Sequence, residues 1–476
     1  MHKRNYVQIM IEQFAADDKN RTALKIFDGK RIEDITYNHL ADKIMQAAGF
    51  FSENGLTGRH IALMGSNCQE WIISYFAIAA SGNVVVPLNP ALPKKTVIKQ
   101  CLQADVSVIC GDEQDIAPYR KDFLCVCYGS LRGETPMRLK DLAGSEQDAT
   151  ALLLFTSGTT GESKAVEITY ANLESSLRSA DGVFSEPEIH RIMTVLPMFH
   201  IAGIRGALSM LYRYKTLCIG RGIMYLFRDM PALSPDYILL VPLMVDSLVK
   251  LVKRTSRDAL HKNYLGANLK RICIGGATID PDHCRFLMSE GFTIDSGYAL
   301  SETTGVGTWG TWDTEHLNTI GKLSGELQCR IVDGELQLKG PAVMKGYYKD
   351  AEATNTVIED GWFHTGDLGY CDADGYFYLT GRKKNLIVMP NGEKLNPEEV
   401  EQQFNTSDAI EECLIRFCNN MLCIEIYAKD ENAASGCVEA YNDSMPLSYQ
   451  IRRITFHKEP LKKTASGKLV RKEMKE

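Results

Sequence analysis

The 476-residue chain lacks the features that mark several common classes of protein. Its 14 cysteines include no Cys-x-x-Cys pair and no regular spacing, so we expect reduced thiols in a cytoplasmic protein rather than a disulfide framework. No secretory signal opens the chain, because Met1–Arg4 leads into a mixed, acidic stretch. The most apolar run, Trp71–Ala80, is too short to span a bilayer, so we expect no transmembrane segment and a buried helix there.

Several kinds of binding or catalytic site are also missing. The net charge of −7 argues against a nucleic-acid partner, because general nucleic-acid binders usually carry a basic excess. The ten histidines do not cluster at metal-ligand spacing, and no Gly-x-Ser-x-Gly nucleophile motif occurs. Gly305–Gly310 has the Gly-x-Gly-x-x-Gly spacing, but the polar residues that follow do not predict the helix that a dinucleotide site needs. The sequence therefore disfavours a zinc enzyme, a serine hydrolase of that type and a dinucleotide-dependent enzyme.

Residues 151–164 are instead typical of a polyphosphate-binding loop. The apolar run Ala151–Phe155 predicts a buried strand, and it gives way at once to hydroxyl side chains, two glycines and a lysine. Glycine lets the backbone approach a ligand closely, and hydroxyls, N–H groups and lysine bind phosphate oxygens. The spacing Gly-x-x-Gly-x-x-Lys differs from that of P-loop enzymes, and an ordinary surface loop is the alternative. The candidate phosphate ligands are Thr156, Ser157, Gly158, Thr159, Thr160, Gly161 and Lys164.

Alternating strand and helix patterns run through the first part of the chain. Helical spacing over residues 36–52 is followed by short strands and helices with brief turns, which predicts an α/β fold with a doubly wound, mostly parallel sheet. After about residue 320 short strands predict a small β-rich layer, and from about residue 383 a compact α/β unit follows. The predicted strands include His60–Met64, Val84–Pro87, Val106–Cys110, Ile192–Leu196, Thr216–Ile219, Tyr237–Val241, Lys270–Ile274 and Glu335–Lys339.

Three later segments contain further candidate ligands. In Gly297–Gly305, Glu302 stands among hydroxyls, which suits Mg²⁺ and phosphate, although a helix-capping cluster has the same composition. Asp367 follows a glycine turn, where a carboxylate can accept hydrogen bonds from two ribose hydroxyls, but a plain Gly-Asp turn looks the same. The basic run Leu461–Arg471 is either a solvated tail or a tail that folds back onto a site.

Taken together, and in this order, the segments resemble the adenylate-forming superfamily of acyl-CoA synthetases, nonribosomal peptide adenylation domains and firefly-type luciferases. The resemblance covers nearly the whole chain and is carried by ordered motifs. Four of them have small departures: Ser163 stands where proline is common, Ala299 and Ser301 where glycine and threonine are usual, Asn385 where aspartate is frequent, and Lys462 where proline is common. The motifs are 156–164, Leu196–Gly203, Gly275–Ala277, Tyr298–Thr303, Gly340–Tyr348, Asp367, Gly381–Asn385 and Lys462–Lys468.

The resemblance implies an ATP-dependent fold in two parts, a large adenylate-forming domain over residues 1–381 and a small mobile lid domain over 382–476. It also implies roles for named residues. The segment 156–164 holds the ATP phosphates, Lys384 is the hinge, and Lys468, Glu302 and His200 are the catalytic residues, with Glu302 as the Mg²⁺ ligand. The remaining nucleotide ligands are Gly276, Ala277, Tyr298 on adenine, Thr303 on the α-phosphate, and Asp367 and Arg382 on the ribose; the acyl pocket consists of His200, Ile201, Ala202, Gly203 and Gly275.

The same resemblance implies that a carboxylate attacks the α-phosphorus of ATP, that pyrophosphate leaves, and that coenzyme A takes the acyl group. Mg²⁺ and Lys468 would offset the repulsion between the two anions. We expect both domains and no appended carrier-protein segment, which favours an acyl- or aryl-CoA synthetase. A stand-alone ligase that loads a carrier-protein thiol, a succinylbenzoate-type ligase and an inactive ATP-binding relative are the alternatives. The oligomeric state, monomer or homodimer, is left open.

The acid substrate is poorly specified by the sequence. Small, apolar residues in the predicted pocket leave room for an alkyl or aromatic group. Arg205 could pair with a second carboxylate of the substrate, but an arginine on a helix face turned away from the pocket is the simpler expectation.

Overall fold

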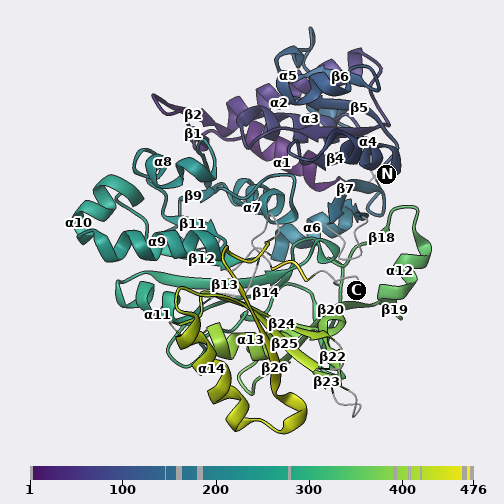
Figure 1. Ribbon diagram of the computed structural model, residues 1–476. Coiled ribbons are helices and arrows are strands. Elements are labelled where there is room, and N and C mark those ends of the chain that lie inside the picture. The colour runs from purple at the N-terminus through teal and green to yellow at the C-terminus, as the bar shows by residue number, and fades with distance from the viewer. Residues whose placement is uncertain are drawn as a thin grey trace.

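The computed structural model describes residues 4–144, 146–156, 163–179, 186–276, 280–389, 394–405, 407, 409–418, 421–463 and 469–471. The predicted α/β fold is confirmed: the chain forms two large mixed sheets, a smaller antiparallel sheet and a compact C-terminal unit (Figure 1). Among the described residues, no helix is both long and apolar enough to cross a membrane.

A seven-stranded sheet contains the first alternating segment. Strands β7, β4, β3, β5 and β6 pair in parallel, in that order. Strand β8 adds antiparallel to β7, and β18 adds antiparallel to β8. The nearly continuous apolar sequence of β4, VVVPL, suits a parallel strand that helices cover on both faces. In spatial order the strands are β18 (Gly346–Tyr347), β8 (Lys164–Thr169), β7 (Thr150–Thr156), β4 (Val84–Leu88), β3 (His60–Met64), β5 (Val106–Gly111) and β6 (Leu124–Cys127).

A nine-stranded sheet forms the second layer, and the N-terminal segment completes it. Strand β1 pairs in parallel with β10, which brings Leu24 opposite Leu217. No local pattern predicts this long-range pairing, and the hairpin β1–β2 was not expected from the sequence. In spatial order the strands are β15 (Lys322–Leu323), β14 (Gly307–Thr311), β13 (Thr293–Ala299), β12 (Arg271–Gly275), β11 (Tyr237–Leu240), β9 (Arg191–Thr194), β10 (Thr216–Ile219), β1 (Thr22–Phe27) and β2 (Ile32–Thr36).

Helices fill the space around these two sheets. The most apolar segment forms helix α3, which is buried on nearly every side as predicted, and one large buried cluster takes side chains from both sheets. The helices of this part are α1 (Tyr6–Ala15), α2 (Tyr37–Glu53), α3 (Gln69–Ala80), α4 (Lys94–Gln103), α5 (Glu113–Ile116), α6 (Tyr170–Arg178), α7 (Ile201–Tyr212), α8 (Leu226–Leu233), α9 (Pro242–Arg254), α10 (Arg257–Leu260) and α11 (Pro281–Ser289).

The predicted β-rich layer is a five-stranded antiparallel sheet. It contains β16 (Gln328–Val332), β17 (Glu335–Lys339), β19 (Ile358–Glu359), β20 (Trp362–Cys371) and β21 (Phe377–Arg382), and helix α12 (Ala351–Val357) precedes β19. A short 3₁₀ turn, η9 (Lys383–Asn385), follows β21 directly.

The C-terminal unit has a hydrophobic core of its own, which includes Val400, Phe404, Ile424 and Val438. It lies at the bottom of the view in Figure 1, at the opposite end from α5 and β6. A boundary at residues 381/382 stays a prediction, and this separate core is consistent with it. The elements are β22 (Ile387–Val388), β23 (Lys394–Leu395), α13 (Pro397–Asn405), β24 (Glu412–Cys418), β25 (Met421–Tyr427), α14 (Glu431–Ser444) and β26 (Ile451–His457).

Candidate nucleotide and acyl site

Several predicted site residues lie at or just after the ends of neighbouring parallel strands of the nine-stranded sheet. Strands β9, β11, β12 and β13 run parallel and adjacent, so the loops after them share one edge. The turn to His200 follows β9, Gly275 and Gly276 end β12, and Tyr298 and Glu302 lie at the end of β13. Open α/β sheets bind ligands outside the carboxyl ends of their strands. The fold therefore gathers residues that lie up to about a hundred positions apart in sequence.

Asp367 forms the centre of a polar cluster at this edge. It is 3% exposed, accepts a hydrogen bond from the Tyr298 hydroxyl at 2.6 Å, and pairs with Arg382 through Nε at 2.5 Å. The hairpin β20–β21 positions this pair, because Asp367 and Arg382 are register partners. Burial, together with the neighbouring carboxylate, raises the pKa of Tyr298 well above its usual value, so its hydroxyl stays a donor. The sequence predicted all three residues but not their mutual contacts.

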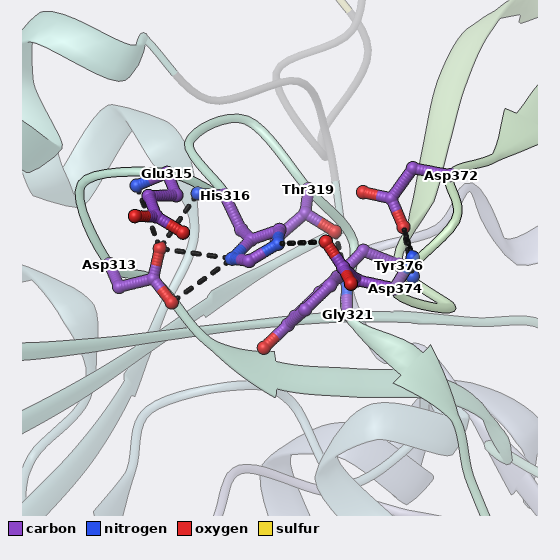
Figure 2. A network of polar contacts seen from close by, with 8 residues as sticks. All are labelled: Asp313, Glu315, His316, Thr319, Gly321, Asp372, Asp374 and Tyr376. Carbon is purple, nitrogen blue, oxygen red and sulfur yellow. Dashed lines mark hydrogen bonds and ion pairs between the residues drawn. The ribbon is translucent and has the colours of Figure 1, made fainter.

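A second network attaches the β20–β21 hairpin to the nine-stranded sheet (Figure 2). The His316 imidazole donates from Nδ1 to Asp313 at 3.1 Å and faces Asp374 through Nε2 at 3.5 Å. Its ring stacks on Tyr376 with ring centroids 3.9 Å apart. Hydrogen bonding to Asp313 raises the pKa of His316, despite some opposing desolvation. The backbone of Phe377 pairs with Gly321 beside this network. These contacts fix the hairpin that holds Asp367 against the sheet that holds Tyr298.

Glu302 lies close to the predicted phosphate loop. Tyr347 donates a hydrogen bond from its hydroxyl to Glu302 Oε1 at 3.0 Å, and Lys164 Nζ lies 4.7 Å from the centre of the Tyr347 ring. Strand β18 brings Tyr347 here by pairing it with Val166 of β8. Tyr347 thus connects the two large sheets, a role that sequence analysis missed. Its only signal was the Gly-Tyr-Tyr end of the motif Gly340–Tyr348.

The phosphate loop is described only at its base. Thr156 and Lys164 face each other across the β7–β8 pair, and both are half-buried. The predicted ligands between them lie outside the described residues: Ser157, Gly158, Thr159, Thr160 and Gly161.

Glu302 suits a hard cation in its chemistry and exposure. Its half-buried carboxylate has one described hydrogen bond, which leaves lone pairs for a metal ion. In proteins Mg²⁺ keeps several waters and takes one or two carboxylates together with phosphate oxygens. The described residues contain no group of three or more His, Cys, Asp or Glu side chains arranged around a metal, so the bound nucleotide would supply other ligands.

Thr303 is placed differently from the neighbouring Ser301. It is fully buried, and its hydroxyl donates to Val306 O at 2.5 Å. The same oxygen accepts a hydrogen bond from the backbone N–H of Leu300. Ser301 is half-buried in the same turn, η8 (Ser301–Thr303). The predicted α-phosphate contact of Thr303 stays a prediction, and of the two hydroxyls that of Ser301 is the more accessible.

The predicted acyl wall begins at the turn before α7. Asn67 holds this turn by bonding to Leu196 O and to the N–H of Met198, each at 2.9 Å. Gly203 is required there, because a Cβ would lie 2.2 Å from Pro197 O. The five predicted wall residues differ in exposure. Partial desolvation by the surrounding protein lowers the pKa of His200. His200 and Ala202 are exposed, Ile201 and Gly203 are buried, and Gly275 is half-buried.

Gly276 follows with φ +88°, a backbone conformation that favours glycine, and it is exposed. Ala277 lies outside the described residues.

The predicted hinge lies just before the C-terminal unit, and the described residues on either side of the catalytic-lysine motif dock on that unit. Lys384 is exposed in η9, where Lys383 pairs with Glu335 at 2.8 Å. Lys468 lies outside the described residues, but the described residues on either side of it are docked. Lys463 pairs with Glu412 at 2.7 Å, Lys463 and Leu469 form a β-bridge, and Arg471 pairs with Glu401. The basic run is therefore not a freely solvated tail.

Comparison with known proteins identifies the family. The chain matches the family model of AMP-binding enzymes over residues 11–348, well over half of its length. The chain belongs to the AMP-binding enzyme family. It is 25% identical over 542 aligned residues to a long-chain-fatty-acid–CoA ligase of Bacillus subtilis, covering 99% of this chain and 94% of the relative. It is 26% identical to a 2-succinylbenzoate–CoA ligase of Oceanobacillus iheyensis over 95% of both chains.

A solved structure shares the fold of this AMP-binding enzyme. The O-succinylbenzoate coenzyme A synthetase of Bacillus subtilis, in complex with AMP, superimposes with a TM-score of 0.85 at 23% identity and covers 98% of each chain. The resemblance to the adenylate-forming superfamily, predicted from the motifs, is thus confirmed by the family match.

Proposed function

We propose that this AMP-binding enzyme activates a carboxylic acid with ATP and transfers the acyl group to coenzyme A. A carboxylate oxygen attacks the α-phosphorus, the bond to the pyrophosphate oxygen breaks, and acyl-AMP forms. The coenzyme A thiolate then attacks the acyl carbonyl, and AMP leaves. The observation that carries the proposal is the meeting of two clusters at one sheet edge, Tyr298–Asp367–Arg382 and Glu302–Tyr347–Lys164.

The first cluster suits a nucleoside. Asp367 is a buried acceptor held by Arg382 and Tyr298, so its position is fixed before a ligand arrives. A carboxylate can accept hydrogen bonds from both ribose hydroxyls, and Arg382 would lie beside the same sugar. Tyr298 would place its ring against adenine while its hydroxyl stays on Asp367. Ribose binding thus explains why Asp367, an acidic residue, lies at a site that binds a negatively charged nucleotide.

The second cluster suits the polyphosphate. Thr156 and Lys164 mark the base of the loop that would bind the β- and γ-phosphates, and Ser301 is better exposed than Thr303 for an α-phosphate contact. Glu302, oriented by Tyr347, would hold Mg²⁺, which supplies positive charge to the phosphate oxygens. Residues of this chain thus hold and orient the nucleotide, while the reacting carboxylate approaches from the side of α7.

Lys468 would complete the charge balance of the first step. Two anions must meet at the α-phosphorus, and a positioned ammonium offsets their repulsion without reorganising at the moment of reaction. The ion pairs Lys463–Glu412 and Arg471–Glu401 tie the described residues on either side of Lys468 to the C-terminal unit. Rotation about Lys384 would then withdraw Lys468 after the first step, as a hinge at the end of an element allows.

Pyrophosphate release tests the proposal. A panel of carboxylic acids is scored with ATP and Mg²⁺, with and without coenzyme A, and acid-dependent ATP–pyrophosphate exchange is measured in parallel. We expect exchange without coenzyme A and thioester formation with it. Exchange with no consumption of free coenzyme A would point to a carrier-protein thiol as acceptor. The absence of exchange with every acid would refute the proposal and favour an inactive ATP-binding relative.

A further inference from the structure

Arg205 is a half-buried positive charge that pairs with no carboxylate in the part of the chain that the structure describes. It lies in the second turn of α7, is half-buried, and donates from Nε to Ser176 Oγ of α6 at 3.1 Å. The titratable groups that face it are the Cys273 thiol and the Tyr237 phenol, and burial raises the pKa of both, so neither carries a negative charge at neutral pH. Desolvation lowers the pKa of Arg205 to about 10, so the guanidinium still carries its charge at neutral pH. No carboxylate among the described residues forms an ion pair with it.

Such a group requires a counter-charge. Withdrawing a charge from water is unfavourable, and buried charges in proteins are normally paired. Ser176 satisfies one of the five guanidinium N–H donors, and its own proton goes to Thr304 O at 2.8 Å. No described protein acceptor bonds to the two terminal nitrogens, and the side chain keeps part of its solvent access. A planar fork of donors of this kind is suited to bidentate binding of a carboxylate.

The location of Arg205 connects it with the acid-binding side of the site. One helical turn separates it from Ile201 of the predicted acyl wall. Its Cδ also lies against Gly305, where an added Cβ would be 2.6 Å from that atom and 3.1 Å from Ile201 Cγ1. Gly305 follows the turn that contains Glu302, at φ +73°. The absence of a side chain at residue 305 therefore makes room for Arg205 beside the acyl wall, and the arginine is not on an outward helix face.

We propose that Arg205 binds a second anionic group of the acid substrate, so that the preferred substrates are dicarboxylic acids. This inference rests on the proposed function and narrows it. The carboxylate that reacts with ATP lies toward Glu302, and the second carboxylate pairs with the guanidinium between α6 and α7. A monocarboxylic acid of the same length leaves the half-buried Arg205 guanidinium unpaired. The enzyme therefore discriminates against it.

Matched substrate pairs test this on the unaltered protein. Dicarboxylic acids of four to eight carbons, phthalate and 2-succinylbenzoate are compared with their monomethyl esters by pyrophosphate release. The ester retains length and shape but removes one charge. For the best acid we expect kcat/KM to exceed that of its ester by roughly 10- to 100-fold, the range associated with a hydrogen bond to a charged group.

Variants then assign the preference to Arg205. Arg205→Met should lower kcat/KM for the diacid by roughly the same 10- to 100-fold and leave that of the ester equal or higher. Arg205→Lys should recover part of the loss, because it restores charge without the planar fork. Arg178→Met is the matched control: this α6 arginine pairs with Glu174 and Glu326 at the surface, and its loss should not alter the preference.

The outcomes separate the two proposals. Exchange with monoacids at least as efficient as with diacids would overturn the role of Arg205 while leaving acid activation intact. An equal loss of kcat/KM for the diacid and for its ester in a folded Arg205→Met variant would also overturn the role of Arg205. If no acid in either set supports exchange by the wild-type protein, the proposed function itself fails, and the inference fails with it.

Discussion

The contact between Tyr347 and Glu302 gives the sharpest test of the site. Replacing Tyr347 by phenylalanine removes one hydroxyl and keeps the ring that Lys164 faces. If Glu302 holds the magnesium of Mg·ATP, the variant loses the donor that orients this carboxylate. The effect should therefore appear in the response to magnesium and ATP and not in the response to the acid.

The structure sets the size of the effect. A hydrogen bond to a charged group contributes about 1.5–3 kcal/mol, and loss of an outer partner of a metal ligand typically costs roughly 10- to 100-fold in affinity or activity. Glu302 is half-buried, so water can replace part of the lost bond, and the lower end applies. We expect Tyr347→Phe to reduce kcat/KM for Mg·ATP by roughly 10-fold, about 1.4 kcal/mol.

The assay is pyrophosphate release titrated separately with Mg²⁺, ATP and the acid. Tyr348→Phe is the control, because the next residue also loses a hydroxyl bonded to a carboxylate, Asp105 Oδ2 at 2.8 Å, but away from Glu302. Thermal unfolding of both variants shows whether Tyr347→Phe and Tyr348→Phe change the stability of the protein to the same extent. If Tyr347→Phe has the magnesium dependence of the wild type, or if Tyr348→Phe shows the same loss, the assignment of Glu302 is refuted.

Three further predictions concern other parts of the molecule. Lys468→Ala should lower acyl-AMP formation by roughly 100-fold or more but spare thioester formation from pre-formed acyl-AMP; equal loss in both steps would contradict this division. Asp367→Asn should raise KM for ATP by roughly 10-fold with a smaller change in kcat, because Arg382 loses its ion pair; unchanged ATP kinetics would argue against ribose binding. His316 has a raised pKa in the folded state, so its pairing with Asp313 stabilises the protein below the unfolded pKa of about 6.5 and is lost as the pH rises through the folded pKa. The difference in Tm between wild type and His316→Gln should therefore be larger at pH 6 than at pH 8, and a difference independent of pH would exclude this linkage.

Much of the local structure followed from sequence patterns. The strands His60–Met64 and Thr216–Ile219 have the predicted bounds, and the buried helix predicted over Trp71–Ala80 forms as α3, because apolar runs are local signals. The parallel sheets followed from strand–helix alternation. Individual site residues such as Asp367 and Glu302 were found because a family resemblance joined motifs that are weak when taken singly.

The contacts between those residues could not be predicted in the same way. Tyr347 reaches Glu302 only because β18 adds to one sheet while Glu302 follows a strand of the other. Arg205 was expected on an outward face because arginine is usually exposed, yet a glycine a hundred residues later makes an interior position possible. The accessibility difference between Ser301 and Thr303 likewise depends on which hydroxyl the turn uses for its own backbone.

By itself, the sequence determined the kind of chemistry: the order of hydroxyl, acidic and basic motifs, and the alternation that aligns parallel strands. Tertiary structure alone decided which of these groups meet, which carboxylate is held by two partners, and where a cation is left without one. The physical reason is that periodicity and composition act over a few residues, whereas burial, charge pairing and hydrogen bonding depend on segments that are distant in the chain and adjacent only after packing.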